Sequence, residues 1–281
     1  MTRAAARLWA LRTVFRAVGP LAPGLAARWA ETLFCTPPRH QVRPAEEAFL
    51  ASGRRSSVRW EGGELAVWEW GQGPLVVLVH GWGSRAARMG ALAAALTARG
   101  LRVMAYDGPA HGRSAGRFAS LPEFARALGA VGAATGPLHG LVGHSLGGAA
   151  VAMALGHGLE ARRVVLLAPP ADVRIFSDIF AETLAVPRPV QEMMHRNLEA
   201  RLRMTWEDLD IPALVRRLSP EALVIHDRDD ADVPIAHGER IVEAWRGSRL
   251  VRTEGLGHRA ILRDPAVVRR TVDFMAGDRS A

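Results

Sequence analysis

Hydrophobic and polar positions follow two alternating patterns along most of this chain. Short continuous apolar runs, of which Leu75–Val79 is the first, predict strands that are buried on both faces. Segments such as Arg85–Arg99 and Leu146–His157 show helical spacing instead. The other predicted strands are Leu101–Ala105, Leu138–Val142, Arg163–Leu167, Ala222–Ile225 and Arg249–Arg252, and the other predicted helices are Leu121–Ala134, His237–Trp245 and Asp264–Met275. Strands that alternate with helices predict an α/β fold, with a mostly parallel sheet of about eight strands and helices on both faces.

Three segments depart from this alternation and define the expected domain organisation. Polar and apolar residues alternate on either side of Gly62-Gly63, which predicts a β-hairpin ahead of the parallel strands. About fifty residues separate the strand that ends near Ala168 from the next one, and this is too long for a simple crossover. We therefore expect an N-terminal helical extension over 1–50, a core over 56–170 and 219–281, and a helical cap insertion over 171–218.

The N-terminal segment predicts an amphipathic helix, because Leu8, Leu11, Phe15 and Val18 recur at helical spacing. Arginines interrupt its apolar stretch, so the segment resembles neither a membrane-spanning helix nor a signal peptide. We expect such a helix to pack on its own domain. A basic helix with a tryptophan can also lie on a membrane surface, and this alternative stays open.

Composition narrows the classes of partner and compartment. The chain has 36 basic and 28 acidic residues, and all the basic ones are arginines. They are spread along the sequence without a nucleic-acid-binding motif, so no nucleic-acid partner is expected. The single cysteine, Cys35, excludes an intrachain disulfide and fits a reducing, cytoplasmic location.

The clearest chemical motif is Gly143-His144-Ser145-Leu146-Gly147, which follows a predicted strand and leads into a predicted helix. A serine at such a sharp turn has its hydroxyl lifted clear of the sheet, and the crowded backbone requires glycines beside it. A histidine, His258, follows the last predicted strand in a glycine-flanked loop. A neutral imidazole can accept the proton of a serine hydroxyl, and a buried carboxylate can stabilise the resulting imidazolium.

With these motifs the chain resembles the α/β-hydrolase family from about Ser56 to its C-terminus. The His80-Gly81-Trp82 segment resembles the family's loop after the third strand. The resemblance implies an oxyanion hole made by the backbone N–H groups of Trp82 and Leu146. The loop from Asp107 to Ser114 resembles another family segment, in which Asp107 and His111 are expected to be structural.

The family order of serine, acid and histidine places the acid late in the chain. The segment Asp227–Pro234 resembles the family's Gly-x-x-Asp-x-x-Val-Pro turn, with an aspartate in place of the glycine. In this register Asp230 is the acid. Asp229 is its closest rival, and Asp232 and Asp172 also stay open.

The resemblance implies a serine hydrolase of the carboxylesterase or lipase type, which cleaves a carboxylic ester or a related acyl bond of a small-molecule substrate. A serine nucleophile argues against the epoxide and haloalkane branches of the family, which use aspartate. No metal-ligand spacing or phosphate-binding loop is present, so neither a metal nor a cofactor is expected.

The expected cap is rich in methionine and phenylalanine, including Phe176, Phe180, Met193 and Met194. These side chains either shape an apolar acyl or alcohol site or fill the core of the cap itself. Two alternatives to a simple esterase stay open: a non-catalytic protein that binds a small molecule, and a peripheral membrane lipase or thioesterase.

Overall fold

The computed structural model describes residues 2–278, and these residues divide into two compact units. Within the described residues, the larger unit contains 37–171 and 210–278, and the smaller contains 2–36 and 172–209. The sequence-based division into 1–50, 171–218 and a core therefore differs from the observed one. The N-terminal helices and the insertion form one unit, and residues 37–50 and 210–218 lie in the larger unit.

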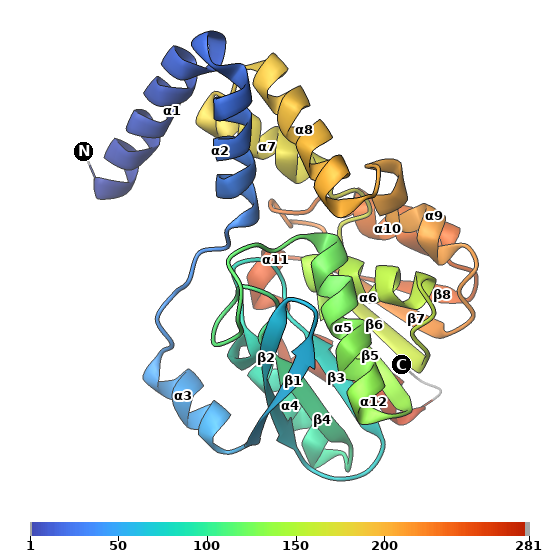
Figure 1. Cartoon of the computed structure of the whole chain (residues 1–281). Helices are drawn as coiled ribbons and strands as arrows, with labels where there is room; N and C mark the ends of the chain where they lie inside the picture. Colours follow the sequence, from blue (N-terminus) through green and yellow to red (C-terminus); the bar gives the residue numbers. More distant parts are fainter. Residues whose placement is uncertain (1, 279–281) are drawn as a thin grey trace. The chain divides into compact units, whose positions relative to one another are not determined.

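The larger unit is built on an eight-stranded sheet with the strand order β1-β2-β4-β3-β5-β6-β7-β8 (Figure 1). The strands are β1 Arg54–Trp60, β2 Gly63–Trp70, β3 Leu75–Val79, β4 Arg102–Tyr106, β5 Leu138–His144, β6 Ala161–Leu167, β7 Glu221–Asp227 and β8 Ser248–Thr253. The pairs β1–β2 and β2–β4 are antiparallel, and all other neighbouring pairs are parallel. The predicted α/β fold with a mostly parallel sheet is confirmed.

Helices cover both faces of this sheet (Figure 1). The helices of the larger unit are α3 Pro44–Ala51, α4 Gly90–Ala98, α5 Leu121–Thr135, α6 Leu146–Gly156, α9 Ile211–Val215, α10 Ala236–Ala244, α11 Gly257–Ala260 and α12 Pro265–Ala276. Val76 and Leu78 of β3 belong to the same buried cluster as Leu92 of α4 and Phe274 of α12. Because successive strand residues point to opposite faces, Val77 faces the other layer, where α5 packs against α6. Burial on both faces explains why the central strands are continuous apolar runs.

Several features of the larger unit differ from the predicted elements; for example, the predicted loop around His258 contains the short helix α11. The helix predicted over Arg85–Arg99 is a 3₁₀ turn, η1 Ala86–Met89, followed by α4. The short helix α3 was not predicted, although Pro44 at its first position and the Glu46 side chain bonded to the Arg43 amide are helix-start signals.

The smaller unit combines two helices of the N-terminal segment with helices of the insertion. These are α1 Arg3–Leu21, α2 Pro23–Cys35, α7 Arg174–Leu184 and α8 Arg188–Leu202, followed by the 3₁₀ turn η2 Glu207–Leu209. Phe15 of α1 stacks on Trp29 of α2 with ring centroids 4.6 Å apart. Phe34 of α2 meets Phe180 of α7 edge to face at 5.3 Å. The apolar side chains of the insertion therefore pack in part against the N-terminal helices.

None of the helices within residues 2–278 has both the length and the apolar composition that crossing a bilayer requires.

Candidate active site

Ser145 lies at a strained turn between β5 and α6. Its backbone angles are φ 54° and ψ −126°, a conformation that a non-glycine residue rarely adopts. Its amide donates to the Leu167 oxygen of the neighbouring strand at 2.9 Å, which fixes the turn on the sheet. A Cβ atom at Gly143 would lie 2.6 Å from the Gly147 oxygen, and a Cβ atom at Gly147 would overlap the Val79 oxygen. Both glycines of the motif are therefore required by close backbone contacts.

His258 lies in α11, just beyond the carboxyl end of β8, and its imidazole contacts Asp230. The Nδ1 atom of His258 is 2.7 Å from Oδ2 of Asp230. The other carboxylate oxygen, Oδ1, accepts the amides of Asp232 at 2.9 Å and Val233 at 2.8 Å. Burial opposes ionisation of this carboxyl, but the hydrogen bonds from His258 and Val233 outweigh it and lower the pKa of Asp230. The imidazole therefore meets an ionised carboxylate at neutral pH.

The three rival carboxylates have other partners. Oδ2 of Asp229 accepts the Gly255 amide at 2.8 Å. Asp232 lies 3.8 Å from the Arg259 guanidinium, and Asp172 accepts the amide of the nearby Arg174 at 2.8 Å. Among these four aspartates, Asp230 is the one that the structure places against the imidazole of His258.

Asp227, which stands where the family has glycine, holds the loop that carries His258. Its Oδ1 atom accepts the Gly257 amide at 2.9 Å, and its Oδ2 atom accepts the Thr253 hydroxyl at 2.7 Å and the Leu256 amide at 3.2 Å. Burial favours the neutral carboxyl, but these hydrogen bonds outweigh it and lower the pKa of Asp227. Sequence reasoning noted the substitution but did not predict these hydrogen bonds to the histidine loop. A carboxylate at the end of a strand that is otherwise a buried apolar run was the signal that could have revealed this role.

His144, the residue before the serine, contacts the histidine loop directly. Its Nε2 atom lies 2.8 Å from the main-chain oxygen of His258, and the two imidazole rings have centroids 4.8 Å apart. A carbonyl oxygen can only accept, so Nε2 of His144 carries the proton. Burial, with a smaller effect of the neighbouring His258, lowers the pKa of His144 to about 3, and the ring is therefore neutral. The turn that bears Ser145 and the loop that bears His258 are thus joined by a hydrogen bond.

The loop after β3 passes beside the serine. A Cβ atom at Gly81 would lie 2.9 Å from Cβ of Ser145, so a side chain at this position would collide with the turn. Trp82 follows and is 38% exposed. Leu146 is the first residue of α6, and the amides of a first helical turn have no intrahelical acceptor and lie at the positive end of the helix. The amides of Trp82 and Leu146 are therefore the candidate donors to a negatively charged oxygen.

Two neutral histidines brace this loop against the loop after β4. Nε2 of His80 accepts the Gly108 amide at 2.8 Å, while its Nδ1 atom donates to the Gly81 oxygen at 2.7 Å. Nε2 of His111 accepts the Gly83 amide at 2.9 Å. Burial lowers the pKa of His80 to about 4 and that of His111 to about 3, so both rings keep an acceptor nitrogen at neutral pH.

Asp107 completes this brace. Its Oδ1 atom accepts the Ala86 amide and its Oδ2 atom the Arg113 amide, each at 2.8 Å. The hydrogen bonds of Asp107 and His111 are with backbone groups, and this geometry is that of structural residues.

A second serine–histidine contact lies in the smaller unit. The Ser177 hydroxyl is 2.6 Å from Nε2 of His195. Ser177 is 0% exposed, so a substrate carbonyl cannot reach its hydroxyl in this structure. The pair is a packing contact within the helical unit.

Comparison with known proteins gives one family match and many structural matches. The sequence model described as serine aminopeptidase, S33, matches residues 73–268. A search of curated proteins finds no match.

Solved structures of three bacterial proteins illustrate the structural similarity. An esterase from Exiguobacterium antarcticum matches with 18% identity and a TM-score of 0.63, over 79% of this chain and 99% of the esterase. A hydrolase from Pseudomonas aeruginosa matches with 23% identity and a TM-score of 0.61, over 80% and 99% of the two chains. A bromoperoxidase from Bacillus anthracis matches with 19% identity and a TM-score of 0.62, over 80% and 100%. At these identities the matches establish a shared fold.

Proposed function

Because this chain belongs to the serine aminopeptidase S33 family of α/β-hydrolases, we propose that it is a serine hydrolase that cleaves a carboxylic ester or a related acyl bond. The observation that carries the proposal is the 2.7 Å contact between the His258 imidazole and the Asp230 carboxylate. The loop that bears His258 is also hydrogen-bonded to His144, the residue before Ser145. The substrate would be a small molecule with an acyl group, and no cofactor takes part in the proposed reaction.

The first half of the proposed reaction forms an acyl-enzyme. Oγ of Ser145 attacks the substrate carbonyl carbon while Nε2 of His258 accepts the hydroxyl proton. The carbonyl electron pair moves onto oxygen, and the amides of Trp82 and Leu146 would donate to that oxyanion. The intermediate collapses when the imidazolium protonates the leaving alcohol.

The second half returns the enzyme to its starting state. His258 takes a proton from water, the hydroxide attacks the acyl carbon, and the protonated imidazole returns the proton to Oγ of Ser145. Asp230 is ionised beside the ring, so it stabilises the imidazolium in both halves. Its contact with Nδ1 also keeps the acceptor lone pair on Nε2, the nitrogen that the serine requires.

Labelling with a fluorescent fluorophosphonate tests this proposal, because such reagents phosphonylate an activated serine. The wild-type chain should be labelled rapidly, and Ser145→Ala should not be labelled. The matched control is Ser177→Ala, which removes the other serine that contacts a histidine and should leave labelling unchanged. A folded wild-type chain that takes up no label would favour the alternative of a non-catalytic small-molecule binding protein.

The bond class is tested separately, because the matched family is described as an aminopeptidase and one structural neighbour as an esterase. p-Nitrophenyl esters of increasing chain length, the corresponding thioesters and aminoacyl p-nitroanilides should be compared at equal concentration. We expect kcat/KM to be highest for the oxygen esters. A preference for the p-nitroanilides would leave the serine mechanism intact but overturn the assignment to esters.

A further inference from the structure

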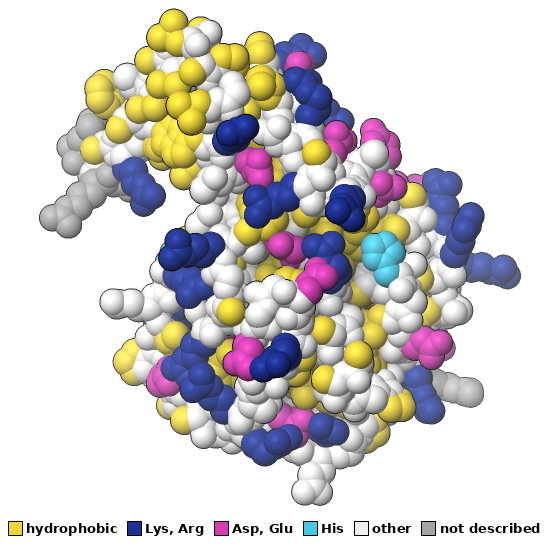
Figure 2. Space-filling model, in the orientation of Figure 1, with side chains coloured by type: hydrophobic (Ala, Val, Ile, Leu, Met, Phe, Trp, Pro, Cys, Tyr) yellow, Lys and Arg dark blue, Asp and Glu magenta, His cyan; other side chains and the backbone are white. Residues whose placement is uncertain are grey.

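The smaller unit exposes an unusual number of large apolar side chains. In the part of the chain that the structure describes, most of the exposed large hydrophobic residues lie in this unit. Leu21 is 86% exposed, Leu25 66% and Trp9 64%, and Val14 and Ile179 are also exposed. Figure 2 shows hydrophobic side chains gathered over the end of the unit where α1 meets α2. Side chains of this size and exposure, when they gather in one patch, mark an interaction surface.

Helix α1 has two apolar faces, of which the core of the unit uses one. Leu8, Leu11, Phe15 and Val18 form the inner face, and Phe15 is fully buried. Other apolar residues recur at intervals of four, three and four positions, so they form a second stripe along the helix. The members of this stripe are all exposed: Ala10, Val14, Ala17 and Leu21. The second stripe therefore makes little contribution to the core of the unit.

The outer stripe continues to the tip of the α1–α2 hairpin. Helix α1 ends at Leu21 and α2 begins at Pro23, so the connection is a single residue between two helices. Both exposed leucines lie at this turn. Leu21 lies between Pro20 and Pro23, and Leu25 follows Pro23 by two residues. Because proline fixes the backbone angle φ, the turn presents its leucines in a rigid arrangement.

The same segment concentrates positive charge. Residues 1–30 contain five arginines and no aspartate or glutamate. This short segment therefore supplies a large share of the net charge of the whole chain, which is +8. Arg7, Arg16 and Arg28 are exposed on α1 and α2. An apolar stripe on helices that also carry exposed arginines and a tryptophan is the arrangement that helices use to lie in the interface of an anionic membrane.

We propose that the α1–α2 hairpin docks the protein on the surface of an anionic lipid bilayer. Leu21 and Leu25 would enter the boundary between headgroups and acyl chains, Trp9 would lie at the headgroup level, and the arginines would contact lipid phosphates. A second copy of the chain fits this surface less well, since a twofold pairing would bring together two hairpins of the same positive charge. The proposal is independent of the catalytic one.

Flotation of the full chain with phospholipid vesicles tests this proposal. We expect the protein to float with vesicles that contain phosphatidylglycerol, to float weakly with pure phosphatidylcholine, and to be released by high salt. The double variant Leu21→Ser, Leu25→Ser should bind anionic vesicles at least about tenfold more weakly, because it loses two buried leucine side chains. The triple variant Arg7→Gln, Arg16→Gln, Arg28→Gln should lose about fivefold per arginine that lies near the surface.

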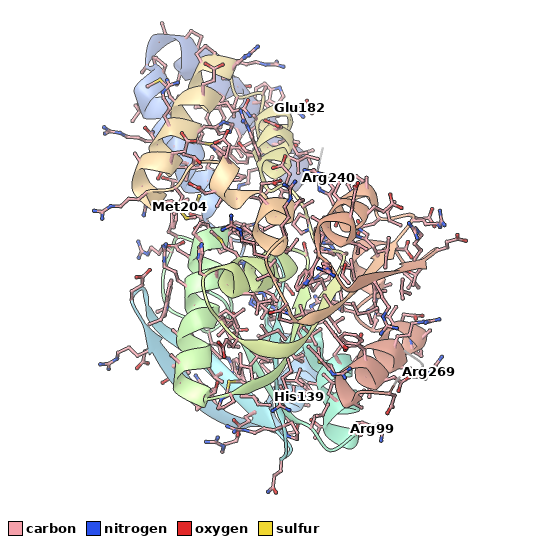
Figure 3. The ribbon with its side chains drawn as sticks, turned by 90° about the vertical axis from the view of Figure 1, so that its right-hand side faces the viewer. Arg99, His139, Glu182, Met204, Arg240 and Arg269 are labelled. Carbon is pink, nitrogen blue, oxygen red and sulfur yellow. The ribbon has the colours of Figure 1, made fainter. Side chains whose placement is uncertain are left out.

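A charge-matched control separates local docking from the general attraction of a basic protein. The variant Arg246→Gln, Arg269→Gln, Arg270→Gln removes the same charge from exposed positions of the larger unit, of which Arg269 is labelled in Figure 3. It should float like the wild type.

Three outcomes would overturn the proposal. The first is that the folded wild-type chain, verified by circular dichroism, does not float with anionic vesicles. The second is that both arginine variants lose binding equally. The third is that sedimentation shows a dimer that Leu21→Ser, Leu25→Ser dissociates, because the surface would then be an interface between two copies.

Discussion

The His144 imidazole donates a hydrogen bond from Nε2 to the main-chain oxygen of His258 across 2.8 Å. This bond joins the turn after β5 to the loop after β8, two segments that are far apart in the sequence. In the proposed mechanism these segments carry the nucleophile and the base. In that mechanism His144 would help to set the distance over which the proton is transferred.

The first prediction concerns this hydrogen bond. His144→Phe keeps a planar ring of similar size but removes the donor, so kcat/KM for an ester should fall about tenfold through misplacement of the His258 loop. The control is His139→Phe, which removes a comparable histidine bond, from Nε2 to the Met275 oxygen at 2.7 Å. His139 lies at the start of β5, at the same end of the core as Arg99 (Figure 3), and its variant should keep full activity. Equal losses in the two variants would contradict a role for His144 in the site.

The second prediction distinguishes the neighbouring aspartates. Asp230→Asn should lower kcat by about 10⁴-fold, as an amide in place of the acid does in serine proteases, because the imidazole then holds the wrong tautomer. Asp229→Asn removes the charge but keeps an oxygen that can accept the Gly255 amide, so it should lower kcat by less than about tenfold. Steady-state kinetics of the two variants on one ester measure this difference in kcat. A larger loss in the Asp229 variant would reverse the assignment of the acid.

The third prediction concerns Asp227, whose carboxylate accepts the amides of Leu256 and Gly257 just before His258. Asp227→Ala leaves these half-buried donors without their acceptor, so the free energy of unfolding should fall by about 1–3 kcal/mol. Activity per folded molecule should also fall, with kcat affected more than KM, because the loop that positions the base loosens. Urea unfolding and kinetics on the same preparation test both effects. An unchanged kcat would limit Asp227 to a role in stability.

The fourth prediction is a loss of stability in mild acid. Burial lowers the pKa of His80 to about 4 and that of His111 and His144 to about 3, below the value near 6.5 of an unfolded chain. Below about pH 6.5 the unfolded chain binds more protons than the folded one, so stability is complete above this pH and falls as the pH drops. Each histidine contributes a slope of up to about 1.4 kcal/mol per pH unit.

Urea unfolding at pH 7 and pH 5 measures this effect. His144→Phe removes one of the three groups, so the stability of this variant should depend less steeply on pH than that of the wild type. A wild-type protein that is equally stable at both pH values would show that these histidines are protonated without cost in the folded state.

The fifth prediction concerns two adjacent glycines at the start of α6. Gly147→Ala should destabilise the protein by more than about 2 kcal/mol, since its Cβ atom would overlap the backbone oxygens of Val79 and His80. The Cβ atom of Gly148→Ala would instead lie 3.2 Å from Cβ of Pro169, where a small shift relieves the contact. The difference in thermal unfolding midpoint between the two variants tests the close approach of the turn to β3.

The central strands and the family motifs were predictable because their signals are local. Leu75–Val79 reads as a buried strand from five consecutive apolar residues, and the structure has the same bounds for β3. The glycines around Ser145 are imposed by a turn of a few residues. The resemblance to α/β-hydrolases that these motifs indicated is confirmed.

Features that depend on contacts between distant segments were not predictable. The N-terminal helices share a unit with the insertion through pairs such as Phe34 and Phe180, and no local pattern encodes that pairing. The hydrogen bonds of Asp227 and His144 to the histidine loop depend on how β5, β7 and β8 align in the sheet. A single sequence specifies the residue types but not this alignment.

The most direct test of the proposed function is detection of the acyl-enzyme. The protein should be mixed with p-nitrophenyl butyrate, quenched in acid after a few milliseconds and examined by intact-protein mass spectrometry, followed by peptide mapping. We predict a butyryl adduct on the peptide that contains Ser145, formed together with a burst of p-nitrophenol and absent from Ser145→Ala. Full ester turnover by Ser145→Ala, or an adduct on another residue, would contradict the proposed function.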